Sequence, residues 1–192
     1  MQKILIIDNR DSFVRNVEQF LREGGADVEV VGVDVLDFMA LGAYAGAVIS
    51  PGPGLPSDYL QLSKFIGIFR NPILGICLGH QAIAEYFGAR LEKYPPRHGH
   101  VSKLKILKNC ELFDGLDSEN IFVGRYHSWR VSHENFPEEL EITSEADDGA
   151  IMSVRHAQRK IFAVQFHPES VMTPLGGAIL NNFLKIIRFE RA

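Results

Sequence analysis

One cysteine stands in a sequence setting that favours nucleophilic chemistry. Cys77 lies between Gly75 and Gly79, where an apolar stretch meets a segment of helical character. This spacing has the form of a nucleophile elbow with cysteine in place of serine, because small flanking residues let strand and helix approach closely. The start of the helix would favour the thiolate, which is the form that attacks. A small buried apolar cysteine is the alternative, and this stretch alone leaves both interpretations open.

A second group with chemical potential is His167-Pro168-Glu169. Pro168 disfavours helix at the preceding residue, so we expect an extended segment in which His167 and Glu169 project to one side. A carboxylate there can accept a hydrogen bond from one imidazole nitrogen and leave the other free to serve a nucleophile. Taken alone, the segment is better explained as a surface turn. Combined with the cysteine elbow, it predicts a triad of Cys77, His167 and Glu169.

A third group is the loop Pro51-Gly-Pro-Gly54. The prolines remove two donors, whereas Gly52 and Gly54 keep their N–H groups and can adopt positive φ. Such a loop can supply one half of an oxyanion hole, and the N–H of Leu78 would supply the other half. A plain turn between a strand and a helix is the simpler alternative.

The elements that must position these groups alternate through the first half of the chain. Apolar stretches predict buried strands at residues 3–8, 27–33, 46–50 and 72–76. Helices are expected between them: one capped by Asp11 or Ser12 and ended by Gly24, one from Ser57 or Asp58 to Phe69, and one over 81–87. This alternation predicts a parallel sheet whose sites gather beyond the carboxyl ends of the strands. Cys77 and the Pro51–Gly54 loop both follow such ends.

The pattern changes after residue 88. Short runs, some alternating between apolar and polar residues, predict antiparallel strands at 101–107, 121–123, 129–131, 140–143, 150–154 and 160–166. An amphipathic helix over 177–188 closes the chain. We therefore expect one α/β domain over residues 1–192, with a mixed, mostly parallel central sheet, flanking helices and an antiparallel extension.

Composition narrows the classes of partner and location. The chain has 192 residues, 46% of them hydrophobic, and a net charge of −4, which indicates neither a nucleic-acid-binding nor a membrane-binding surface. Two cysteines, Cys77 and Cys110, without a signal peptide or a long apolar stretch, predict a reducing cytoplasm. No cluster has metal-ligand spacing, so no metal is expected, and His98 and His100 should be solvated. His80 is expected to be structural.

The combined motifs resemble those of the class I, triad-type glutamine amidotransferases. The resemblance is carried by Gly75-Ile-Cys-Leu-Gly-His-Gln81, Phe166-His-Pro-Glu-Ser170 and Ser50-Pro-Gly-Pro-Gly54. Two further segments, Asp8-Asn-Arg-Asp-Ser-Phe13 and Tyr126-His-Ser-Trp129, are similar to those of the small subunits of anthranilate synthase and aminodeoxychorismate synthase. The similarity spans the whole chain, with the motifs in the family's order.

The resemblance implies a fold, a reaction and a set of site residues. The fold would be the flavodoxin-like one of this family, and the reaction would be hydrolysis of L-glutamine by Cys77, His167 and Glu169. It implies an oxyanion hole from Gly52 and Leu78, and glutamine contacts from Gly52, Gly54, Gln81, Ser128 and Trp129. It implies no cofactor in this chain. The protein partner would be a chorismate-using synthase large subunit, which would bind magnesium and receive the ammonia.

Three alternatives stay open at this point. The amidotransferase subunit of aminodeoxychorismate synthase shares all of these motifs. A free-standing cysteine hydrolase of γ-glutamyl compounds would use the same triad without an ammonia acceptor. A non-catalytic scaffold subunit is disfavoured because a binding module has no need of a complete triad.

Overall fold

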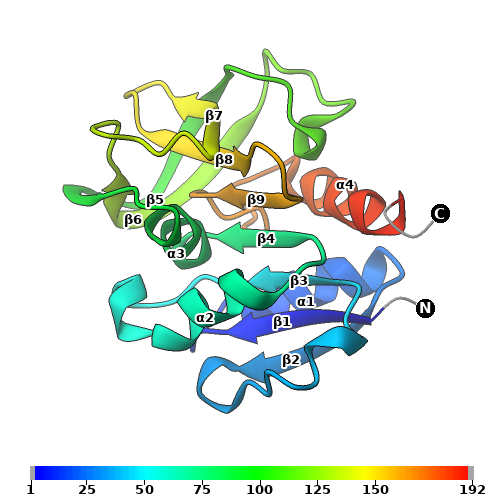
Figure 1. The fold of residues 1–192 in the computed structure, drawn as a ribbon. Coiled ribbons are helices and arrows are strands. Elements are labelled where there is room, and N and C mark those ends of the chain that lie inside the picture. Colours follow the sequence, from blue (N-terminus) through cyan, green and yellow to red (C-terminus); the bar gives the residue numbers. More distant parts are fainter. Residues whose placement is uncertain (1–2, 190–192) are drawn as a thin grey trace.

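One mixed sheet of nine strands runs through the part of the protein that the computed structural model describes, residues 3–189 (Figure 1). The strand order is β2-β1-β3-β4-β9-β8-β7-β5-β6. Helices cover both faces, which confirms the predicted α/β class. The outer limits of the predicted 1–192 domain, residues 1–2 and 190–192, lie outside the described residues.

The parallel half of the sheet forms around five neighbouring strands. Each pairs in parallel with its neighbour, and their bounds are β2 Asp27–Gly32, β1 Lys3–Asp8, β3 Gly46–Ile49, β4 Ile73–Ile76 and β9 Ile161–Val164. The three central strands β3, β4 and β9 are buried at every position. Burial on both faces explains why these strands are continuous apolar runs rather than alternating ones.

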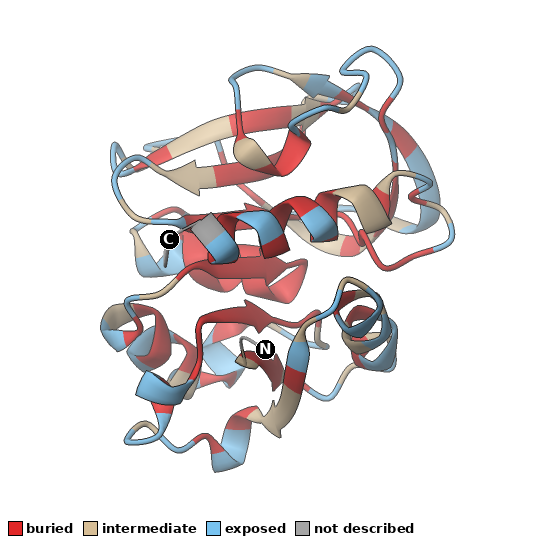
Figure 2. Ribbon diagram, turned by 90° about the vertical axis from the view of Figure 1, so that its right-hand side faces the viewer, coloured by how far each residue is buried: buried red, intermediate tan, exposed pale blue. Residues whose placement is uncertain are grey.

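Two pairs of helices account for this burial. Helices α1 (Val14–Glu23) and α4 (Gly176–Phe189) pack in one apolar cluster with Ile4 and Ile6 of β1. Helices α2 (Leu60–Ile68) and α3 (Leu78–Tyr86) pack in a second cluster with Leu5 and Ile7, on the other face. Alternate residues of one strand therefore feed two cores. Figure 2 shows the strands between these helices buried, with exposed residues on the outer sides of the helices.

The antiparallel half extends the sheet from β9. It consists of β8 Ile151–His156, β7 Leu140–Ala146, β5 Leu91–Ile106 and β6 Phe122–Val131. The short helical turns are η1 Val33–Val35, η2 Leu41–Ala43, η3 Pro56–Asp58 and η4 Glu111–Phe113.

Several predicted elements differ from the observed ones. The segment predicted as an antiparallel strand at 160–166 contains β9, which is antiparallel to β8 but parallel to β4, and it is buried on both faces. Its parallel partner comes from a segment about 90 residues earlier, which local periodicity does not reveal. The short strands predicted at 121–123 and 129–131 belong to the one strand β6.

Strand β5 is also longer than predicted. It begins at Leu91, ten residues before the predicted start, and tolerates Pro95, Pro96 and Gly99 through two interruptions of its register with β6. Bulges of this kind absorb residues that a regular ladder excludes.

The predicted helix caps are wrong in detail. The Asp11 carboxylate accepts from the N–H of Phe13, but α1 starts only at Val14. Ser57 and Asp58 lie in η3 ahead of α2, and the Asp58 carboxylate accepts from the N–H of Leu55. Both carboxylates therefore brace the turn before the helix, where backbone N–H groups lack partners within the helix.

Candidate active site

The elbow predicted around Cys77 is present. Strand β4 ends at Ile76, Cys77 follows with φ +52° and ψ −98°, and α3 begins at Leu78. The N–H of Cys77 donates to the carbonyl of Val164 in β9 at 2.8 Å, and its carbonyl accepts from Gln81 at 3.1 Å. A positive φ at a residue other than glycine is strained, and such strain gathers at functional sites because the surrounding fold enforces it.

Two glycines make this turn possible. A Cβ on Gly75 would lie 2.5 Å from the carbonyl oxygen of Gly79, and a Cβ on Gly79 would lie 2.4 Å from that of Ile49. Both contacts are with backbone, which cannot move aside cheaply. The glycine spacing therefore reflects the close approach of α3 to β4 and β3, as the sequence pattern predicts.

His167 and Glu169 lie together in the segment that follows β9. The Nδ1 of His167 is 2.7 Å from Oε1 of Glu169, and the two residues are 3% and 2% exposed. The predicted extended geometry is wrong: residues 167–170 form a turn closed by the N–H of Ser170 donating to the carbonyl of His167 at 3.2 Å. The two side chains meet across this turn rather than along one side of a strand.

The backbone of His167 is held by the antiparallel half of the sheet. Its N–H donates to the carbonyl of Gly124 in β6 at 3.1 Å, and its carbonyl accepts from the Thr173 hydroxyl at 2.7 Å. Thr173 in turn accepts from the N–H of Gly124 at 3.0 Å. The ring lies against Phe13 and Tyr126, with centroid distances of 5.8 and 5.0 Å.

The charge state of His167 depends on its two neighbours. Burial alone disfavours the imidazolium, but Cys77 and then Glu169 outweigh burial and raise the pKa of His167 well above its ordinary value of 6.5. Its Nε2 is buried and has no hydrogen-bond partner among the described residues. Glu169 thus contacts one nitrogen of the imidazole, and the nearby sulfur favours the same charged form, as a thiolate–imidazolium pair requires.

A cavity of about 310 Å³ opens in front of Cys77. Its lining includes every predicted oxyanion-hole and glutamine-contact residue: Gly52, Gly54, Leu78, Gln81, Ser128 and Trp129. His98, expected to be solvated, is exposed but also lines this cavity, with Nε2 3.4 Å from the Ser128 hydroxyl. Loops from the ends of β3 and β4 and residues of β6 therefore meet at one opening.

The loop after β3 is held rigidly against the elbow. A Cβ on Gly52 would lie 2.6 Å from the Leu78 side chain and 2.9 Å from the Asn9 carbonyl, so glycine is required there. The Ser50 hydroxyl accepts from the N–H of Asn9 at 3.0 Å, and Tyr59 donates to the carbonyl of Pro53 at 2.9 Å. The predictions did not identify Asn9 or Tyr59 as supports of this loop, because neither residue type marks a loop contact and Asn9 lies 41 positions from Ser50.

Gln165 is a second residue that the predictions did not single out. It is fully buried, and its Nε2 lies 3.6 Å from the Cys77 sulfur. Its Oε1 accepts from Nε2 of Gln81 at 3.1 Å. Its place two residues before His167 was the available signal, although an amide at that position does not by itself indicate chemistry.

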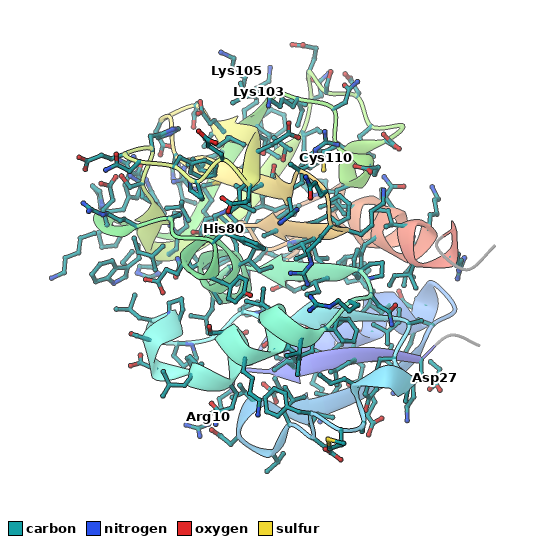
Figure 3. The ribbon with its side chains drawn as sticks, viewed as in Figure 1. Arg10, Asp27, His80, Lys103, Lys105 and Cys110 are labelled. Carbon is teal, nitrogen blue, oxygen red and sulfur yellow. The ribbon has the colours of Figure 1, made fainter. Side chains whose placement is uncertain are left out.

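The other histidines and the second cysteine have different surroundings. His80 lies in α3 (Figure 3). It is fully buried, and burial, with a smaller contribution from His127, lowers its pKa to about 3, so its ring is neutral. Burial also raises the pKa of Cys110 to about 11. His100 is exposed. Within residues 3–189, no group of three or more His, Cys, Asp or Glu side chains is arranged to hold a metal ion.

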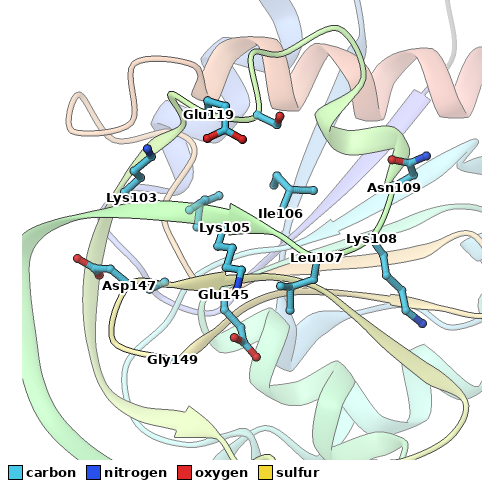
Figure 4. A pocket seen from close by; sticks show the side chains of 13 residues that line it. Lys103, Lys105, Ile106, Leu107, Lys108, Asn109, Glu119, Glu145, Asp147 and Gly149 are labelled. Atoms are coloured by element: carbon cyan, nitrogen blue, oxygen red, sulfur yellow. The ribbon is translucent and has the colours of Figure 1, made fainter.

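A larger cavity, of about 790 Å³, lies at the antiparallel end of the sheet (Figure 4). Its lining mixes Lys103, Lys105 and Lys108 with Glu119, Glu145 and Asp147. None of the motif residues lines it, so the smaller cavity beside Cys77 is the candidate active site.

No helix within the described range is long and apolar enough to span a bilayer.

Comparison with known proteins agrees with this geometry. The chain is 41% identical over 194 residues to the anthranilate synthase component 2 of Methanothermobacter marburgensis, covering 95% of this chain and 98% of that one. It is 40% identical over 199 residues to the chloroplastic anthranilate synthase beta subunit 1 of Arabidopsis thaliana, covering 96% and 70%. A solved structure from Thermoplasma acidophilum, described as that of a candidate GMP synthase component, matches with a TM-score of 0.90 and 33% identity over 100% of this chain and 96% of that one.

The family assignment rests on nearly the whole chain. Residues 5–187 match the family described as glutamine amidotransferase class-I, a range that includes the elbow, the His167 turn and the cavity. The chain therefore belongs to the class I glutamine amidotransferases.

Proposed function

We propose that this chain is the glutaminase subunit of an anthranilate synthase: it hydrolyses L-glutamine and passes ammonia to a chorismate-using large subunit. The observation that carries the reaction is the convergence of Cys77, His167 and Glu169 beside one cavity. The relatives named as anthranilate synthase subunits, at about 40% identity over nearly the whole chain, support the choice of partner.

The first half of the reaction forms a thioester. The Cys77 thiolate attacks the side-chain carbonyl carbon of glutamine, and His167, as imidazolium, gives its proton to the departing nitrogen, so that ammonia leaves. Glu169 stays ionised and keeps the ring in the orientation that presents Nε2. In the second half, water activated by His167 hydrolyses the thioester to glutamate and restores Cys77.

The substrate is held by the residues that line the cavity. The N–H groups of Gly52 and Leu78 stabilise the oxyanion, and removal of one such donor typically costs about two to three orders of magnitude in rate. Gly54, Gln81, Ser128 and Trp129 contact the glutamine. A volume of about 310 Å³ suits one amino-acid side chain with its main-chain groups.

Delivery of ammonia requires a partner. Ammonia released into water at neutral pH is protonated and lost as a nucleophile, so the large synthase subunit should cover the opening of the cavity. We expect it to contact residues 11–15 and the loops near Pro56 and Tyr126. Phe13 and Tyr126 contact the His167 ring, so a partner bound there could change the position of His167. The chain itself would need no cofactor, magnesium would belong to the partner, and the reaction would be cytoplasmic.

Glutamine hydrolysis by the purified chain tests this proposal. It should be measured alone and with each chorismate-using large subunit of the source organism, with Cys77→Ala and Cys110→Ala as a matched pair. We expect weak activity alone, a strong increase with the anthranilate-forming partner, loss in Cys77→Ala and retention in Cys110→Ala.

The other outcomes identify the alternatives. If only the aminodeoxychorismate-forming partner stimulates hydrolysis, the ammonia goes to that enzyme. The same conclusion would hold for a GMP-forming partner, which the name of the structural neighbour suggests as a further candidate. Full activity on γ-glutamyl peptides without a partner would indicate a free-standing hydrolase. Undiminished hydrolysis in Cys77→Ala would contradict the mechanism.

A further inference from the structure

A continuous line of hydrogen bonds ends at the Cys77 sulfur. It starts at the carbonyl of Trp129, which accepts from Nε2 of Gln81 at 3.2 Å. The same Nε2 donates to Oε1 of Gln165 at 3.1 Å, and Nε2 of Gln165 lies 3.6 Å from Sγ of Cys77. Gln165 is 0% exposed and Gln81 4% exposed, so bulk water does not compete for these groups.

The Trp129 carbonyl, at the start of this line, determines which atom is the donor in each hydrogen bond that follows. A backbone carbonyl can only accept, so the Gln81 atom that faces Trp129 must be its NH₂ group. The second hydrogen of that group requires an acceptor, which makes the facing atom of Gln165 its oxygen. The Gln165 NH₂ group must then point at the sulfur. The chemistry of the partners therefore assigns both amide orientations, which otherwise look alike.

The Trp129 carbonyl is held in place by His127, which in turn contacts the buried guanidinium of Arg125. Arg125 is 0% exposed, its Nη1 donates to Asp148 at 2.8 Å, and its Nε donates to Nε2 of His127 at 3.1 Å. Because a guanidinium cannot lose its proton, Nε2 of His127 must be the acceptor and Nδ1 carries the hydrogen. Nδ1 then donates to the Trp129 carbonyl at 2.8 Å.

We propose that Gln165 is a further catalytic residue, whose amide N–H, oriented by Gln81 and the Trp129 carbonyl, stabilises the Cys77 thiolate, and that Arg125 and His127 are positioning residues for that carbonyl. This inference rests on the proposed nucleophile and deepens it. A thiolate acceptor strengthens a hydrogen bond that is modest to a neutral thiol. The amide thus favours the charged form before glutamine arrives and holds the sulfur at the cavity.

The rate of Cys77 alkylation by iodoacetamide as a function of pH tests the proposal without using the glutaminase reaction. The measurement is made in a Cys110→Ala background, so that Cys77 is the one thiol followed. In Gln165→Met, a side chain of similar length without a donor, we expect alkylation on the acidic side of the profile to slow about tenfold, with an unchanged alkaline plateau. Gln165→Glu keeps an acceptor for Gln81 but brings no N–H to the sulfur, and should slow alkylation in the same way.

The surface variant Gln158→Glu is the matched control and should leave the profile unchanged, since Gln158 is exposed. His127→Gln, which acts through the carbonyl, should move the profile in the same direction by less. An unchanged profile in folded Gln165→Met and Gln165→Glu would overturn the proposal. Partner-stimulated glutamine hydrolysis by the unsubstituted chain, lost in Cys77→Ala, would show that the proposed function still stands. If neither Gln165 variant folds, Gln81→Met releases the same amide from its orienting bond, and an unchanged profile there would be equally decisive.

Discussion

At the scale of single residues, the candidate site depends on the His167 imidazole, which has two negatively charged neighbours, the Glu169 carboxylate and the Cys77 thiolate. Glu169 accepts from Nδ1 of His167 at 2.7 Å, and Cys77 lies close enough to the ring to raise its pKa. Both anions favour the imidazolium, which is the acid that the proposed reaction needs to release ammonia. Glu169 is 2% exposed, so bulk water screens its charge little.

Glu169→Gln tests this dependence. The amide is nearly isosteric but carries no charge, so the imidazolium is less stable and the ring can turn or change tautomer. We expect kcat for glutamine hydrolysis to fall about 100-fold or more, with a smaller change in KM. Glu138→Gln, at an exposed carboxylate, is the matched control and should keep full activity. Equal activities of the two variants would refute the assigned role of Glu169.

At the scale of elements, the turn at Cys77 forms because the backbones of β3, β4 and α3 approach more closely than side chains at Gly75 and Gly79 would permit. The positive φ of Cys77 costs free energy, of the order of 1–3 kcal/mol, that the packing of β4, α3 and β9 must offset. Gly75 and Gly79 allow this packing, and the Cys77 N–H is anchored to the Val164 carbonyl. Stability and the exposure of the proposed nucleophile are therefore linked in this turn.

Gly75→Ala should be destabilising for this reason. The added methyl group would lie 2.5 Å from the Gly79 carbonyl oxygen, a contact that only a backbone shift relieves. We expect the free energy of unfolding, measured by urea titration, to fall by about 1–3 kcal/mol or more, with loss of activity in the protein that still folds. Gly42→Ala, where nothing lies within 4 Å of the added methyl group, should change stability by less than about 0.5 kcal/mol. Similar values for both variants would contradict the packing argument.

At the scale of the whole molecule, the candidate active site lies between the carboxyl ends of the parallel strands β3 and β4 and the antiparallel edge strand β6. The parallel half supplies Cys77 and the loop of Gly52, whereas strand β6 of the antiparallel half supplies one wall of the cavity and the carbonyl that holds His167. Two buried histidines, His80 of α3 and His127 of β6, lie near each other in this part of the molecule. Because both can take up a proton on unfolding, global stability should depend on pH.

The free energy of unfolding should fall as the pH is lowered from about 6.5 toward 4. Burial is the main cause that lowers the pKa of His127 to about 4, so the unfolded chain takes up a proton below pH 6.5 that the folded chain refuses. Because the unfolded state then binds more protons, stability decreases with falling pH, by about 2 kcal/mol between pH 7 and pH 5 for this group. The pKa of His80, lowered to about 3, acts in the same direction.

Urea titrations of the unsubstituted chain and of His127→Gln at both pH values isolate this contribution. The variant lacks the titrating ring, so the stability difference between the two proteins should shrink by about 2 kcal/mol at pH 5. A difference that does not change with pH would show that His127 is protonated in the folded state.

Much of this arrangement could be predicted because it is encoded locally. The strand–helix alternation of the first half follows from apolar runs and their flanking glycines, and the elbow follows from the spacing of Gly75, Cys77 and Gly79. The direction of β9, the continuity of β5 through Pro95 and the turn at His167 were predicted incorrectly. Each depends on a partner far along the chain, and periodicity within one segment carries no information about that partner.

The sequence by itself determined the reactive groups, the order of the elements in the parallel half and the family to which the chain belongs. These features depend on residue types and on their spacing within short segments, because backbone sterics and burial act on neighbouring residues. Only the tertiary structure decided which side chains support them. The amide of Gln165 reaches the sulfur across 88 positions, and Asn9 and Tyr59 hold the Gly52 loop from other segments. The hydrogen bonds of Gln165 and Asn9 join residues that lie far apart in the sequence. They can form only after the whole sheet has folded and brought the two groups together.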